Sequence, residues 1–419
     1  MATGGPSAGR RGRSPGCRAL LQAASALSRV HVCMHHTVGI QEGGVVKRLN
    51  FRWALLGVAV AAGVFVMASS SATPSNVAYA TGQIVKYKKI PTFEYRGKPF
   101  NAKAGAGKTI FNIPIASYIP YIVQTDQLMA KLAARYGYKM TEFANQGQPS
   151  QWVDGMNQAI AQKVNLIILQ GAPIPQLLVP QLAAAKKAGI PVLFTHNIDP
   201  SEAVPAGVDV AVTAPFQQAA RLEADWVISR TKGKADVLII TSDEVLPTTG
   251  IKKALASEFA KRCGSTCKLK YVNVPINDWA TKIGSETKAA LTADPGINYI
   301  IPIYDSMSFY AVPAVVEAGK DKTVKIATYN GTPDVLKYIV AGQVVTMEVG
   351  ESLAWLAHAN MDAAMRILTG QKVPKKLNEF TPTRIFDRTN VAETGNPPGF
   401  IPGYGAAYIA GYKKIWSGK

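Results

Sequence analysis

The stretch KVNLIILQGAPIPQLLVPQLAAAKKAGIPVLFTHN, residues 163–197, decides the fold of this chain. It contains four consecutive apolar residues, Leu166 to Leu169, then an amphipathic segment over 176–188, and then a second apolar run, Val192 to Phe194. Consecutive apolar residues in a short run are typical of a strand that is buried on both faces of a parallel sheet. The stretch therefore predicts a β–α–β unit of an α/β fold.

Similar units continue along most of the chain. Strands are expected at 109–116, 140–144, 166–170, 192–195, 208–213, 236–241, 269–274, 299–303, 324–329 and 344–349. Helical patterns lie between them, at 122–136, 151–162, 176–188, 216–231, 250–262, 280–292, 307–318, 333–341 and 352–369. These units are too many for one open sheet, and the turn-rich stretch 197–207 divides them near the middle. The sequence predicts two Rossmann-like, doubly wound parallel-sheet lobes whose strand-end loops face one cleft.

Composition excludes some classes of protein. The chain has 419 residues, of which 47% are apolar and 17% charged, so it is neither disordered nor fibrous. The formal charge of +19 permits binding to nucleic acid. The basic residues are scattered rather than gathered in one run, which favours solvated faces and no nucleic-acid partner.

The N-terminal region has the pattern of an export signal. Lys47, Arg48 and Arg52 precede the apolar run 53–68, and Ala78-Tyr79-Ala80 resembles a cleavage site. We expect a signal peptide over 45–80, an upstream extension that is not native over 1–44 and a polar lead-in over 81–107. The alternative is an uncleaved membrane anchor, for which the run is short. Removal of residues 1–80 leaves 38 basic and 26 acidic residues, a net charge of about +12.

Two cysteines remain after the expected cleavage. Cys263 and Cys267 form the pattern C-G-S-T-C with no further metal ligands nearby, which favours a small disulfide ring over a metal site. No cysteine stands at the cleavage point, so the lipoprotein type of anchor is not expected. These features predict a soluble monomer in a periplasm.

Several motifs together resemble a known family. Residues 163–197, Tyr304 to Met307, 325–334 and 336–342 are similar to the ribose-type (type I) periplasmic solute-binding proteins of ABC transporters, and the resemblance covers about 108–375. It implies two lobes joined by a three-strand hinge, which close around a small ligand for delivery to a membrane permease. The expected N-terminal lobe is 108–211 with 350–385, and the expected C-terminal lobe is 212–349 with 386–419. Hinge bending is expected near Val212-Thr213, near Val349-Gly350 and around Arg384 to Asp387. The tail 397–419, with aromatic residues at four-residue spacing, is expected to form a helix on one lobe.

The resemblance also implies a ligand site at the strand ends. The family's aromatic pair is matched by Tyr118 and Tyr121, its stacking aromatic by Trp279, and its usual Asp-Arg pair by His196-Asn197. The family's Asn-Asp is matched by Tyr304-Asp305, and Asn330 replaces its next Asp. Each of these residues also has a structural alternative, such as packing for the aromatic rings and helix capping for Asp305. Gln148, Gln170 and Glu348 are weaker candidates.

Neutral residues stand where sugar binders of the family carry charges. Charge-assisted hydrogen bonds are about twice as strong as neutral ones, so Asn197 and Asn330 predict a weaker grip on sugar hydroxyls. Four rings, those of Tyr118, Tyr121, Trp279 and Tyr304, predict a more aromatic pocket. A sugar derivative, or a less hydroxylated aromatic or carboxylate solute, is therefore expected rather than a simple aldose.

Other functions have weaker support. The string AGAGKT at 104–109 lacks the first glycine of a phosphate-binding loop and precedes a strand, and no nucleophile elbow or zinc motif is present. Neither an enzyme nor a cofactor is expected. A ligand sensor that acts on a chemoreceptor or sensor kinase remains an alternative. A repressor with the same core is disfavoured, because residues 1–80 supply a leader instead of a DNA-binding domain.

Overall fold

The computed structural model describes residues 73–94, 97–171, 173–377, 381–399 and 401–418. The expected upstream extension over 1–44 and the part of the expected signal peptide before Thr73, with the apolar run 53–68, lie outside the described residues. Among the described residues, no helix is both long and apolar enough to cross a membrane.

The first lobe is built on a six-stranded sheet. All pairings in this sheet are parallel, in the order β11-β5-β4-β3-β1-β2. Alternate residues of its central strands belong to two hydrophobic clusters, so both faces are covered by helices. The strands are β1 (Thr109–Pro114), β2 (Lys139–Glu142), β3 (Leu166–Gln170), β4 (Val192–Thr195), β5 (Val210–Val212) and β11 (Lys376–Leu377), and the helices are α2 (Pro120–Arg135), α3 (Pro149–Ala161), α4 (Val179–Lys187) and α10 (Leu353–Leu368).

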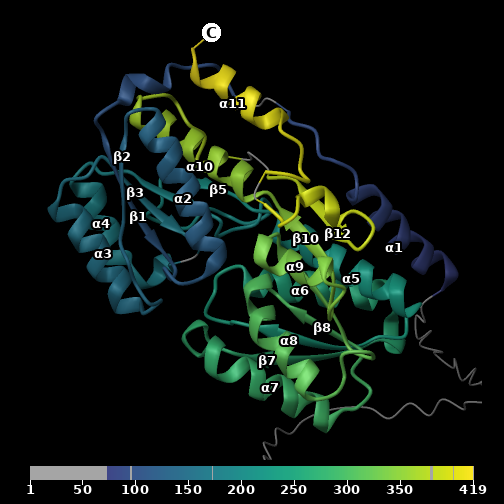
Figure 1. The fold of residues 1–419 in the computed structure, drawn as a ribbon. Helices are drawn as coiled ribbons and strands as arrows, with labels where there is room; N and C mark the ends of the chain where they lie inside the picture. The colour runs from purple at the N-terminus through teal and green to yellow at the C-terminus, as the bar shows by residue number, and fades with distance from the viewer. Residues whose placement is uncertain (1–72, 95–96, 172, 378–380, 400, 419) are drawn as a thin grey trace, which may run out of the picture. The chain divides into compact units, whose positions relative to one another are not determined.

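The second lobe repeats this plan. Its sheet has the order β12-β10-β9-β8-β6-β7 and is parallel apart from the antiparallel pair β10–β12. The strands are β6 (Asp236–Thr241), β7 (Lys268–Asn273), β8 (Tyr299–Pro302), β9 (Lys325–Asn330), β10 (Val345–Glu351) and β12 (Thr383–Asp387), and the helices are α5 (Phe216–Thr231), α6 (Thr248–Arg262), α7 (Trp279–Ala293), α8 (Ser308–Glu317) and α9 (Pro333–Val340). Two α/β lobes with mostly parallel sheets confirm the predicted fold class (Figure 1).

A helix spans the predicted boundary between the signal peptide (45–80) and the polar lead-in (81–107). Helix α1 (Pro74–Tyr87) packs against α5 of the second lobe, with Ala80 completely buried (Figure 1). Thr73 caps the helix by accepting a hydrogen bond from the backbone N–H of Asn76 at 3.3 Å. The Asn76 side chain donates to the Arg262 carbonyl at 3.1 Å. The predicted cleavage after Ala80 would therefore divide a packed helix, and the first half of α1 belongs to the folded chain.

The lead-in then passes to the first lobe. Lys88 pairs with Asp387 of β12 at 2.8 Å, and the Lys88 carbonyl accepts from the Arg384 guanidinium at 2.8 Å. Five residues later the Phe93 ring packs against Trp355 of α10, with ring centroids 5.5 Å apart. We call residues 88–93 the strap, because they join an anchor on the second lobe to an anchor on the first.

The tail corrects a second expectation, since residues 386–419 were assigned to the C-terminal lobe. Tyr404 does pack there, against Phe386 of β12, with ring centroids 5.1 Å apart. Helix α11 (Ala407–Trp416) instead packs on α10 of the first lobe (Figure 1). The ring of Tyr408 stacks on Trp355 at 4.8 Å and that of Trp416 on His358 at 5.5 Å. The apolar face of α11 is buried there by contacts between aromatic rings.

The chain crosses between the sheets close to two of the three predicted places. Strand β5 ends at Val212 and α5 begins at Phe216, as expected for the first crossing. Strand β10 remains in the second sheet through Glu351, so the second crossing is at Ser352 rather than Val349-Gly350. Arg384 to Asp387 lie within β12, so the third crossing falls earlier, between Leu377 and Thr383. Residues 350–351 and 383–385 thus belong to the second lobe.

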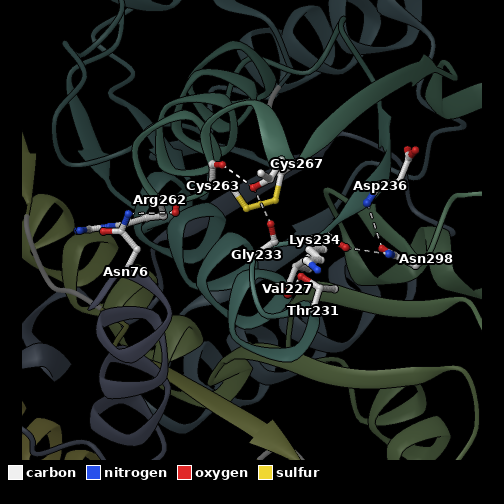
Figure 2. The surroundings of a disulfide bond; sticks show 11 residues. Asn76, Val227, Thr231, Gly233, Lys234, Asp236, Arg262, Cys263, Cys267 and Asn298 are labelled. Atoms are coloured by element: carbon white, nitrogen blue, oxygen red, sulfur yellow. Dashed lines mark hydrogen bonds between the residues drawn. A yellow bond between two sulfur atoms is a disulfide. The ribbon is translucent and has the colours of Figure 1, made fainter. Parts of the chain in front are cut away.

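The predicted disulfide is present. Cys263, at the end of α6, is bonded to Cys267, which precedes β7 (Figure 2). Between them, the Thr266 hydroxyl donates to the Gly233 carbonyl at 2.7 Å. The ring therefore fixes the turn that brings α6 into the edge strand of the second sheet.

Candidate functional site

A small cavity lies where the carboxyl ends of the two sheets meet. The first lobe contributes residues that follow β1, β3 and β4, and the second contributes residues that follow β6, β7 and β8 and the last residue of β9. The described lining residues are Ile115, Ile119, Tyr121, Ile122, Gly171, His196, Val245, Ile276, Trp279, Tyr304, Ser306 and Asn330. This is the place where open α/β sheets bind ligands.

The lobes are closed on each other around this cavity. The Tyr118 hydroxyl donates to the Ile276 carbonyl of the second lobe at 3.0 Å. The cavity measures about 40 Å³. Pockets for small molecules commonly measure about 300–1,000 Å³, so this arrangement has little room for a solute.

His196 and Tyr121 form the wall on the first lobe. Their rings pack against each other at a tilt of 33° with centroids 4.6 Å apart, and the Tyr121 hydroxyl lies 3.0 Å from His196 Nδ1. Burial lowers the pKa of His196 to about 3, so its ring is neutral at physiological pH. His196 also adopts a left-handed backbone conformation, with φ of 53°, at the turn that follows β4. This wall offers an aromatic surface without charge.

Trp279 and Tyr304 form the wall on the second lobe. Their ring centroids are 6.5 Å apart. The Trp279 indole N–H donates to the Ser242 hydroxyl at 2.7 Å, which holds the ring in place at the start of α7. Burial raises the pKa of Tyr304, so its hydroxyl stays protonated. Two rings from each lobe therefore border the cavity, counting the imidazole of His196.

Asp305 is fully buried behind the wall, where it organises the loop that follows β9. Its carboxylate accepts from the Thr332 backbone N–H at 2.7 Å and from the Asn330 amide at 3.4 Å. No hydrogen bond from this carboxylate caps the helix that begins at Ser308, in contrast to the structural alternative suggested by the sequence. Asn330 lines the cavity, and its buried amide oxygen has no hydrogen-bond partner among the described residues.

The structure brings together most of the eight predicted ligand residues. Tyr121, His196, Trp279, Tyr304 and Asn330 line the cavity. The other three lie outside its lining: Tyr118 bridges the lobes, Asp305 holds the loop, and the Asn197 amide donates to the Leu169 carbonyl at 3.0 Å. Contact of any of the eight with a ligand stays a prediction.

Aliphatic residues supply a large part of the lining and were missed from the sequence. Ile115, Ile119 and Ile122 flank the predicted tyrosine pair, and Val245 and Ile276 face them from the second lobe. Such residues after a strand cannot be told from core residues by pattern alone. Their position directly beside Tyr121 was the available signal. No described lining residue carries a charge at neutral pH.

Two α/β lobes that close a cavity between their strand ends define the class of two-lobed binding proteins. Residues 110–372 match the family model of the periplasmic binding protein domain, and the chain belongs to this family. It is similar to the D-ribose/D-allose-binding protein of Pseudomonas aeruginosa, with 26% identity over 219 residues, which are 52% of this chain and 67% of that protein. This relative is a binding protein and not an enzyme.

Solved structures show the same fold. One is an ABC transporter solute-binding protein from Agrobacterium vitis with bound allitol, which is 18% identical, with a TM-score of 0.61 over 68% of this chain and 97% of that one. Another is an ABC transporter periplasmic solute-binding protein from Actinobacillus succinogenes with bound D-allose, which is 22% identical, with a TM-score of 0.60 over 68% and 99% of the two chains. At these identities the likeness concerns the fold.

Proposed function

We propose that this chain is the exported substrate-binding protein of an ABC importer and captures a small neutral solute between its lobes. The observation that carries the proposal is the cavity at the facing strand ends, lined by both lobes without a charged side chain among the described residues. A ligand that contacts both lobes only in the closed form shifts the hinge toward closure by its differential affinity. A membrane permease then receives the solute from the closed protein.

The lining narrows the class of solute. Aliphatic and aromatic side chains dominate, and the lining residues that carry polar groups include Tyr121, Tyr304, Ser306 and Asn330. An ionised carboxylate would find no described cation to pair with, and an unpaired buried charge is costly. A deoxygenated sugar or another neutral solute with an apolar face fits better than a fully hydroxylated aldose. The names of similar proteins mention ribose, allose and allitol, which supports a sugar-like solute in general.

A thermal-shift screen followed by calorimetry tests this function. We expect neutral deoxy sugars to raise the melting temperature more than D-ribose, D-xylose or D-glucose, since a ligand at 100 times its Kd stabilises by about 2.7 kcal/mol. Trp279→Ala should abolish the shift, and Tyr271→Ala, on the exposed edge strand β7, should leave it unchanged. Tight binding of an aldose would overturn the proposed ligand class. The absence of binding by any of these solutes or by aromatic acids would overturn the proposed role.

Export is part of the proposal, and the position of α1 changes where the leader should end. Because α1 begins at Pro74 and is capped by Thr73, we place cleavage before Thr73, where Ser70-Ser71-Ala72 offers small residues. Intact-mass analysis of the periplasmic protein measures this end directly. A mature chain that begins at Thr81 would contradict the placement.

A further inference from the structure

Glu351 lies directly behind the wall of the interlobe cavity. It is the last residue of β10 and is completely buried. One of its carboxylate oxygens, Oε2, accepts from the Tyr329 hydroxyl at 2.6 Å and lies 3.4 Å from the Tyr121 hydroxyl. The same oxygen is 3.5 Å from His196 Nδ1. The other oxygen accepts from the Thr381 hydroxyl.

These partners come from both lobes. Tyr121 and His196 belong to the first lobe and line the cavity, whereas Tyr329 belongs to β9 of the second. Thr381 belongs to the third crossing between the sheets. A change in the hydrogen bonding of Glu351 therefore affects Tyr121 and His196 in the cavity wall and also Thr381 in a hinge segment.

The Tyr121 hydroxyl has one proton and two competing acceptors. It can donate to Glu351, or it can donate to His196 Nδ1 when that nitrogen holds a lone pair. An ionised Glu351 attracts the Tyr121 proton and favours the His196 tautomer with hydrogen on Nδ1. A protonated Glu351 has a proton of its own to donate, and then Tyr121 is free to donate to an unprotonated Nδ1.

The surroundings of Glu351 favour its protonated form near neutral pH. The titratable groups that face it are the phenols of Tyr121, Tyr329 and Tyr404 and the neutral imidazole of His196. Burial raises the pKa of Glu351 to about 8, and the hydroxyls of Tyr329 and Tyr121 oppose this shift.

Other charged groups nearby do not neutralise Glu351. Asp305 and Glu348 are buried acids near Tyr404, and they act on Tyr404 together with Glu351. Arg384 is a cation near Tyr404. Its guanidinium donates to the backbone carbonyls of Lys88 and Gly403 and to the Glu393 carboxylate rather than to Glu351.

We propose that Glu351 is a proton-operated positioning residue of the interlobe cleft. Gain or loss of one proton on Glu351 reverses the hydrogen bond between Tyr121 and His196 and so changes the polar groups presented to the solute. The inference deepens the proposed function, because it names a regulation of the same cavity, yet its first test needs no ligand.

The first test is an NMR titration of the His196 ring in uniformly ¹⁵N-histidine-labelled protein, with the ring signals assigned from His196→Gln. We expect a neutral ring from pH 6 to 9.5 whose Nδ1 shift moves from the unprotonated toward the protonated range with a midpoint near pH 8. Glu351→Gln cannot ionise, so the Nδ1 shift should become independent of pH. A constant Nδ1 shift in the unmodified protein, or an unchanged midpoint in Glu351→Gln, would overturn the inference.

Two further variants guard against a failure of Glu351→Gln to fold. Tyr121→Phe removes the shared hydroxyl and should leave the Nδ1 shift unresponsive near pH 8. Glu348→Gln changes another buried acid, three residues earlier on β10, and should leave the midpoint in place. Because His196 Nδ1 also lies 3.5 Å from Glu351 Oε2, a response that survives Tyr121→Phe would count against the relay through the Tyr121 hydroxyl. A response that disappears in Glu348→Gln would count against Glu351.

The second test measures solute affinity between pH 7 and 9 with the best solute from the thermal-shift screen. We expect a change of about threefold or more, which corresponds to half a pKa unit of coupling, and a flat profile for Glu351→Gln. If the NMR response is present and no solute binds, the proposed function fails while the proton-dependent hydrogen bonding stands. A flat affinity profile in the unmodified protein, with the NMR response present, would overturn the regulatory part.

Discussion

The hydroxyl of Tyr118 in the first lobe donates a hydrogen bond to the backbone carbonyl of Ile276 in the second, over 3.0 Å. This contact spans the mouth of the cleft, since Ile276 also lines the cavity and Tyr118 is 39% exposed. It can form only when the lobes are closed, so it contributes to closure and not to the folding of either lobe.

Tyr118→Phe should therefore shift the protein toward the open form. A typical hydrogen bond contributes about 0.5–1.5 kcal/mol, which is roughly a two- to thirteenfold change in the ratio of open to closed molecules. Single-molecule energy transfer between dyes on the two lobes measures this ratio. Tyr271→Phe, which changes an exposed tyrosine of β7 away from the cleft, is the control. An equal effect of both variants would contradict the role of the Tyr118 contact.

Removal of the disulfide should destabilise the second lobe. For a ring of five residues, loss of the cross-link costs about 2 kcal/mol of unfolding free energy through the entropy of the unfolded chain. The variant Cys263→Ser/Cys267→Ser should thus unfold at lower urea concentration than the unmodified protein. A reductant should reproduce this loss in the unmodified protein and have no effect on the variant. Equal stability with and without the bond would contradict the prediction.

Two substitutions in helix α1 should change the stability of the protein in opposite directions. Ala80 is completely buried against the body of the protein, so Ala80→Glu should cost at least about 2 kcal/mol by placing a carboxyl group in an apolar contact. Gly82 lies in the same helix, and a Cβ there would meet nothing within 4 Å, so Gly82→Ala should stabilise by roughly 0.5–1 kcal/mol. Urea denaturation measures both changes. Indifference to Ala80→Glu would mean that α1 is not docked in solution.

Asp225 on α5 should make stability depend on pH. Burial, and next the charge of Glu258, raise the pKa of Asp225 to about 7 from 3.8. The folded state then holds the proton more tightly than the unfolded state does. The contribution of Asp225 to stability is complete below about pH 4 and is lost as the pH rises toward 7. Asp225→Asn should reduce the fall in unfolding free energy over this range, whereas Asp154→Asn, at an exposed position, should not. Parallel profiles for Asp225→Asn and the unmodified protein would contradict the assignment.

The two lobes were predictable because buried parallel strands have an unmistakable pattern. Leu166 to Leu169 are apolar on consecutive positions, and all four are completely buried in β3. Helix α1 could also have been predicted, because apolar residues recur in it at helical spacing, namely Val77, Ala80, Ile84 and Tyr87. The adjoining apolar leader and the Ala78-Tyr79-Ala80 pattern favoured a different interpretation.

The partner of the tail and part of the cavity could not be predicted. The apolar face of α11 indicates that it packs on something, but the pattern does not tell which lobe carries the matching aromatic surface around Trp355 and His358. Ile119 and Ile276 are ordinary apolar residues until the lobes close and bring them to one cavity. The position of Glu351 behind that cavity depends in the same way on contacts between distant segments.

The strap is a short covalent link between the two lobes. Phe93, which contacts Trp355, is five positions after Lys88, which pairs with Asp387, and this segment spans at most about 17 Å when fully extended. A larger separation of the two attachment sites requires that the Lys88–Asp387 ion pair or the Phe93–Trp355 contact break first. The strap borders the same surface hollow as Pro215, Thr381 and Thr383 of the crossing segments, so this covalent link joins the two lobes beside the hinge.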